Sequence, residues 1–160
     1  MKKLIGSELA AVAAMVLALG LAACGTEPEE EEEHHEPHEV ELVMGSTVLA
    51  SYEVDETTWE GSLEVDAGAE TGQIEVRFLD DEGDELHFED EDEPVYLEVD
   101  VADAAIAEFV LSAPGAFTGT FRGKTAGQTG VTIKLMHGEL GQGHPDLQTT
   151  PLQATVNAGG

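Results

Sequence analysis

Basic residues are scarce in this chain. It holds 6 Lys and Arg against 34 Asp and Glu among 160 residues, which gives a formal net charge of −28. Nucleic acid and anionic lipid surfaces are both bound through clustered Lys and Arg side chains. The composition therefore excludes a nucleic-acid partner, and it excludes a basic surface as the means of membrane attachment. The excess of Asp and Glu has two explanations, a cation-binding surface or adaptation to high salt, and the sequence leaves both open.

Cysteine is almost absent, since Cys24 is the only one. A single cysteine forms no internal disulfide, so it needs another role. Two lysines at positions 2 and 3 precede an apolar stretch (10–19), and Leu21-Ala22-Ala23-Cys24 follows. This order resembles the signal peptide and lipobox of bacterial lipoproteins. The resemblance implies that residues 1–23 are removed and that Cys24 is lipidated and holds the chain at a membrane.

A long apolar run is also missing. A transmembrane helix needs about 20 apolar residues, and Glu8 interrupts the stretch at the start of the chain. The lipid on Cys24 is therefore the expected membrane contact. Residue 25 is Gly rather than Asp. In a Gram-negative cell, the resemblance to sorted lipoproteins then implies the outer membrane, on its periplasmic or its surface face.

Residues 24–39 form an acidic linker rich in Glu, interrupted by Pro28 and Pro37. Like charges repel and proline stops a helix, so we expect a disordered tether. The tether also carries three histidines, which are His34, His35 and His38. They are either a weak collecting site for Zn²⁺ or Cu²⁺ or part of a solvated spacer.

Residues 40–160 alternate between apolar and polar side chains with the period of two that is typical of β-strands. Turn-forming residues such as Gly83 and the Pro114-Gly115 pair separate the alternating segments. This spacing predicts an all-β domain, an antiparallel β-sandwich. The alternating segments are 40–44, 63–66, 74–79, 97–102 and 131–135.

The second half of this domain, about residues 60 to 157, resembles the bacterial Ig-like domains of group 2. The matching segments are a middle strand at 95–100, an Ile-Ala pair at 105–109, a glycine-containing turn at 119–123 with 126–129, and a last strand at 151–156. Tyr96 stands where the family usually carries Trp in the middle strand. The resemblance implies an Ig-like fold with a structural or adhesive role, in contact with envelope proteins. We expect a monomer.

No pattern in the chain indicates catalysis. A Gly-x-Ser-x-Gly nucleophile turn is missing, and lipid consumes the one thiol. Aromatic residues make up only 5% of the chain, too few to line a sugar-cleaving cleft. We therefore expect that the protein is not an enzyme.

His137 and His144 flank a glycine-rich loop, and Asp146 follows closely. The loop brings its own ends together, so both imidazoles and the carboxylate are expected to meet at one end of the sandwich. Two His and a carboxylate suit Zn²⁺ or Cu²⁺, and His87 is a candidate fourth ligand. The alternative is a pair of exposed loop histidines, with Asp146 bonded within a local turn.

The segment Asp80–Glu85 has the composition of a calcium loop, but its only glycine is misplaced for an EF-hand. An irregular Ca²⁺ site on a sandwich loop, joined by Asp90, Glu91 and Asp92, remains an alternative. The other interpretation is a solvated hairpin tip.

Overall fold

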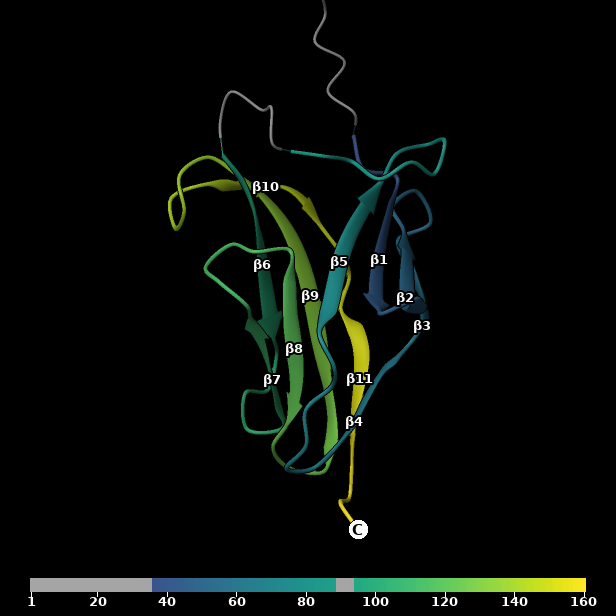
Figure 1. The fold of residues 1–160 in the computed structure, drawn as a ribbon, viewed down its shortest axis with the longest axis vertical. Coiled ribbons are helices and arrows are strands. Elements are labelled where there is room, and N and C mark those ends of the chain that lie inside the picture. The colour runs from purple at the N-terminus through teal and green to yellow at the C-terminus, as the bar shows by residue number, and fades with distance from the viewer. Residues whose placement is uncertain (1–35, 89–93) are drawn as a thin grey trace, which may run out of the picture. The chain divides into compact units, whose positions relative to one another are not determined.

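The computed structural model describes residues 36–88 and 94–160 (Figure 1). Contacts between Cα atoms divide the chain into Met1–Glu33 and His34–Gly160, and the described residues belong to the second unit. The predicted signal peptide and Cys24 lie outside the described residues, as do His34 and His35. Within the described ranges no helix has the length and apolar character needed to cross a membrane.

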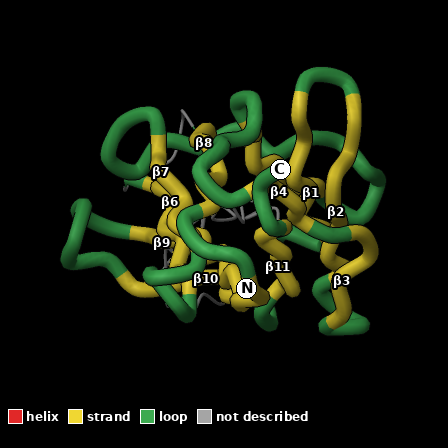
Figure 2. The backbone as a smooth tube through the Cα atoms, turned by 90° about the horizontal axis from the view of Figure 1, so that it is seen from below, coloured by secondary structure: helices red, strands yellow, loops and turns green. Residues whose placement is uncertain are grey.

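Every regular element of the described residues is a strand, so that only strands and loops are seen in Figure 2. In chain order these strands are β1 (Glu39–Met44), β2 (Thr47–Glu53), β3 (Thr58–Gly61), β4 (Leu63–Asp66), β5 (Ile74–Leu79), β6 (Val95–Val101), β7 (Ala107–Leu111), β8 (Thr118–Gly123), β9 (Gly127–His137), β10 (His144–Gln148) and β11 (Leu152–Asn157).

The strands form two sheets. The first sheet has six strands in the order β3-β2-β1-β5-β8-β7. The second sheet is built around β9, which pairs with β6 along one edge and with both β10 and β11 along the other. β4 completes the second sheet by pairing with β11 in parallel. Residues 149–151 interrupt the strand between β10 and β11. These two strands therefore lie one after the other along the same edge of β9.

This connectivity is that of an immunoglobulin sandwich. β5, β8 and β7 lie in the order of strands B, E and D of such a domain, and β6, β9 and β11 lie in the order of C, F and G. The all-β, Ig-like antiparallel sandwich predicted from the sequence is confirmed.

The core lies between the two sheets and follows the alternation in the sequence. In β5 the buried residues are Ile74, Val76 and Phe78, and the residues between them are half-buried. β9 buries Val131, Ile133 and Leu135 in the same way. Because successive side chains of a strand point to opposite faces, each sheet has one apolar face and one charged face.

One predicted turn is wrong. Its second part, 126–129, lies mostly in β9, which begins at Gly127. Residues 119–123 form most of β8, and Phe121 within it is fully buried. The glycines of this segment serve close packing instead of a turn. A Cβ on Gly119 would lie 2.5 Å from the Phe109 ring, and a Cβ on Gly123 would lie 2.6 Å from the Asp66 carbonyl oxygen. Neighbouring backbone and side chains therefore occupy the space that a side chain would need.

Candidate functional site

The candidate site lies where β9 ends and β10 begins. His137 is the last residue of β9 and His144 is the first residue of β10. The antiparallel register places these two residues directly opposite each other. Side chains at directly opposed positions point to the same face of a sheet. The two imidazole rings consequently lie side by side, with their centroids 5.6 Å apart.

Glycines allow the short loop 138–143 to connect the two opposed histidines. Gly138 has a φ of 109°, in the region that favours glycine. Gly143 has no room for a side chain, since a Cβ there would lie 2.5 Å from the carbonyl oxygen of His137. The backbone N–H groups of Gln142 and Gly143 both donate to the Glu139 carbonyl, at 2.8 and 2.9 Å. The loop is thus tightly folded on itself.

Tyr96 of β6 ties the same loop to the second sheet. Its hydroxyl donates to the Glu139 carbonyl at 3.4 Å and accepts the N–H groups of Gly141 at 3.2 Å and Gly143 at 3.3 Å. Leu97 faces the core, so Tyr96 points to the outer face of the sheet, where it is only 5% exposed. Tyr96 therefore supports the histidine loop instead of filling the core.

A β-bulge positions Asp146. The register of β10 against β9 shifts between Pro145 and Leu147, which leaves Asp146 as the extra residue. Leu147 takes the place opposite Leu135 and packs against the core. A bulge bends the strand and re-aims the side chain of the inserted residue. In this way one short strand supplies both a core contact and a carboxylate beside the histidines.

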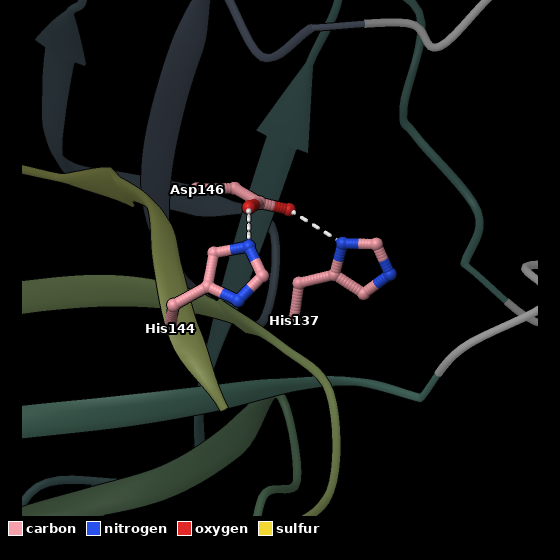
Figure 3. Close-up of side chains that lie close together, drawn as sticks. All are labelled: His137, His144 and Asp146. Atoms are coloured by element: carbon pink, nitrogen blue, oxygen red, sulfur yellow. Dashed lines mark ion pairs between the residues drawn. The ribbon is translucent and has the colours of Figure 1, made fainter. Parts of the chain in front are cut away.

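The Asp146 carboxylate lies between the two imidazoles (Figure 3). Its Oδ2 is 3.3 Å from Nδ1 of His137, and its Oδ1 is 3.3 Å from Nε2 of His144. One ligand atom from each of the three residues lies within 4.8 Å of the others. The side chains of His137, Asp146 and His144 are 27%, 40% and 70% exposed. The three residues predicted to meet at one end of the sandwich do meet there, and solvent reaches them.

The described residues include four Lys and Arg side chains, and each of them forms its ion pairs with carboxylates other than Asp146. Arg77 pairs with Glu75 and Glu85, and Arg122 pairs with Glu70 and Glu108. The remaining two are Lys124, paired with Glu108, and Lys134, paired with Asp100 and Glu98. The carboxylate of Asp146 consequently faces imidazole nitrogen, which is the donor type that zinc and copper bind.

His87, the predicted fourth ligand, is not part of this three-residue group. It is exposed, and it lines a pocket of about 290 Å³ together with Phe88 and Phe117. That pocket lies against β5, whose Arg77 and Phe78 form part of its wall. The structure therefore brings together three of the four predicted residues.

The other candidate ligands lie apart from this group or outside the described residues. His38 is exposed, and its backbone extends β1 by donating to the Leu79 carbonyl at 2.8 Å. Asp80 accepts the N–H groups of Glu82 and Asp84 through Oδ1, each at 2.9 Å. Its carboxylate thus stabilises the turn that contains it. The remaining predicted calcium ligands, Asp90, Glu91 and Asp92, are not among the described residues.

Comparison with known proteins gives only weak similarity to solved structures. No family model and no curated protein matches this chain. A solved structure, domains 4 and 5 of the S-layer protein SbsC, is similar with a TM-score of 0.44 and 18% sequence identity. The similarity covers 62% of this chain and 49% of that one, so the chain spans about half the length of the solved structure. A similarity at this level indicates nothing about function.

Proposed function

We propose that this protein is a lipid-anchored, non-catalytic module of the bacterial cell envelope, with an Ig-like sandwich that serves structure or protein contact. The observation that carries the proposal is the position of Cys24. It ends the sequence Leu21-Ala22-Ala23-Cys24, and the first strand of the sandwich begins soon afterwards, at Glu39. The lipid and the folded module are then separated only by the acidic linker, residues 24–39.

The charge of the chain supports the lipid as the membrane contact. The net charge of −28 repels anionic head groups, so the folded surface does not adhere to the bilayer unaided. Each CH₂ group of a buried acyl chain contributes about 0.8 kcal/mol, and two or more chains hold a protein stably. An outer-membrane position follows from Gly25 if the cell is Gram-negative.

The sandwich supports a role that does not depend on catalysis. Its core is completed by its own strands, from Val40 in β1 to Val156 in β11, without a disulfide. Ig-like sandwiches serve many unrelated functions, so the role has to come from the surface rather than the fold. The chain offers no thiol beyond Cys24 and no serine nucleophile turn. A scaffold or binding module fits these features best.

The test is to express the full chain and the Cys24→Ser variant in a Gram-negative host and to separate the membranes. We expect the unaltered chain to start at Cys24 with the mass of a lipidated cysteine and to require detergent for release. Cys24→Ser should lose the lipid mass and leave the membrane fraction. Gly25→Asp is the matched control, because it should keep the lipid but move the protein to the inner membrane. An unaltered chain without lipid would refute the proposal.

A further inference from the structure

We infer that His137, His144 and Asp146 form a binding site for Zn²⁺ or Cu²⁺. This inference goes beyond the proposed function and is independent of it, since the site belongs to the folded module and the anchor does not. Two imidazoles and one carboxylate are a donor set that both metals accept. Ca²⁺ and Mg²⁺ prefer oxygen donors alone, so the two nitrogens select against them.

The distances fit a tetrahedral ion with little movement. Bonds of about 2.1 Å at tetrahedral angles place neighbouring donor atoms about 3.4 Å apart. The Asp146 carboxylate lies 3.3 Å from a nitrogen of each histidine. All three ligand atoms lie within 4.8 Å of one another, so a small closing movement brings them to the spacing that a tetrahedral ion sets. His144 can make this adjustment because its side chain is 70% exposed.

The backbone holds the three groups before any ion arrives. His137 ends a central strand and is paired with Val95 of β6 on one side and with His144 on the other. The bulge sets Asp146, and the Tyr96 hydroxyl holds the loop between the histidines. A site on strands with a tied loop loses little conformational freedom on binding, which favours affinity.

A fourth coordination position is expected to face solvent. Three protein ligands leave one position of a tetrahedral zinc ion for water or for an outside group. His144 and Asp146 are both exposed at the rim of the sandwich, so the open side of the ion would be accessible. The competing explanation is that the Asp146 carboxylate pairs with the two imidazoles and binds no metal. Only a metal titration separates the two explanations.

The experiment uses the full chain in detergent, stripped of metal, with His34→Ala, His35→Ala and His38→Ala together as the background. These three substitutions remove the linker histidines from the measurement. Zn²⁺ and Cu²⁺ are each titrated in competition with a chromophoric chelator, and Ca²⁺ and Mg²⁺ serve as control ions. We expect one equivalent of Zn²⁺ or Cu²⁺ to bind with micromolar affinity or better, at a salt concentration that screens the acidic surface.

Three variants in this background test the ligands. His144→Ala, Asp146→Asn and the pair His137→Ala with His144→Ala should each weaken binding by more than about tenfold, since even outer-shell changes cost that much. His144→Ala replaces a side chain that is mostly exposed, so the fold is expected to survive it. Circular dichroism without metal checks this for every variant. His87→Ala is the matched control and should bind as the background does.

Three results would overturn the inference. The first is a background protein that binds neither Zn²⁺ nor Cu²⁺ at micromolar concentration. The second is equal affinity in the background and in folded His144→Ala. The third is Ca²⁺ that displaces the bound ion at equal concentration, because this would identify a diffuse acidic surface. None of these results depends on whether Cys24 carries lipid, so failure of the metal site and failure of the proposed function are distinguishable.

Discussion

The indole Nε1 of Trp59 donates a hydrogen bond of 2.7 Å to the carbonyl oxygen of Thr150. Trp59 belongs to β3 in the first sheet, and Thr150 lies in the break between β10 and β11 in the second. Two further bonds act on the same residue. The Tyr52 hydroxyl accepts the Thr150 N–H at 3.4 Å, and the Thr150 hydroxyl donates to the Thr57 carbonyl at 3.1 Å. The β2–β3 hairpin therefore holds the point where the chain passes from β10 to β11.

Replacing Trp59 with Phe removes the indole N–H and leaves an aromatic ring against Tyr52. We expect the free energy of unfolding to fall by about 1 kcal/mol, the net value of one hydrogen bond. Urea denaturation followed by circular dichroism measures this change. Tyr52→Phe removes the longer bond to Thr150 and should cost less. A Trp59→Phe variant as stable as the unaltered chain would show that the bond contributes nothing.

Tyr96→Phe removes the hydroxyl that holds the histidine loop and keeps the buried ring. If the site binds metal, the affinity for Zn²⁺ should fall by about tenfold, the lower range for loss of an outer-shell partner. Tyr52→Phe is the matched control, because it removes a tyrosine hydroxyl that bonds to Thr150 and not to the loop. Competition titration gives both affinities. Equal affinities in the two variants would contradict a positioning role for Tyr96.

Phe121→Ala tests the core contribution of β8, most of which the sequence resemblance predicted to be a turn. Phe121 is fully buried, and removing its ring should cost about 3 to 5 kcal/mol of the free energy of unfolding. Val110→Ala on the neighbouring β7 is the control, since this side chain is 40% exposed. The control should change stability by less than about 0.5 kcal/mol. Thermal or urea unfolding distinguishes the two, and a small effect at Phe121 would argue against a central position in the core.

Glu39→Gln should stabilise the sandwich at neutral pH. Partial burial and the nearby carboxylates of Glu53, Glu41 and Glu60 raise the pKa of Glu39 above its ordinary value. A raised carboxyl pKa means that the ionised form destabilises the folded state, and that protonation removes this penalty as the pH falls. The gain should be less than about 1 kcal/mol, because the group is largely solvated.

The advantage of Glu39→Gln should shrink as the pH falls through the raised pKa. It should be lost below the ordinary glutamate value of about 4.3. Thermal unfolding across this range, with the exposed Glu56→Gln as control, measures the effect. A gain in stability that is the same at every pH would have a cause other than ionisation of Glu39.

The long alternating strands could be predicted from the sequence because burial on one face is a local property. In β5, and in β9 from Thr129 to Leu135, every second residue is buried, and the pattern needs no knowledge of the partner strand. β10 carries no such signal. Its sequence is His-Pro-Asp-Leu-Gln, and all its residues are exposed except Leu147. This strand exists because β9 offers it backbone partners, which a local pattern does not reveal.

The same distinction applies to the candidate site. The sequence predicted that His137, His144 and Asp146 would meet, because a short glycine-rich loop joins them. It did not predict the bulge that positions Asp146 or the Tyr96 hydroxyl that ties the loop from 45 residues away. The prediction that included His87 placed this residue on a strand after the acidic hairpin, but His87 lies outside the strands. His87 instead lines a pocket beside β5 and is not part of the three-residue group.

The sequence by itself determined the chemistry that is available to this protein. With Cys24 as its only thiol and acid in large excess, any metal ligand in the folded module has to be an imidazole or a carboxylate. It also determined which face of each alternating strand is buried, since the alternation of apolar and polar residues is a local property. The tertiary structure alone decided which groups come within reach of one another. Register, bulge and loop support depend on hydrogen bonds between distant segments, and these form only once the two sheets have assembled.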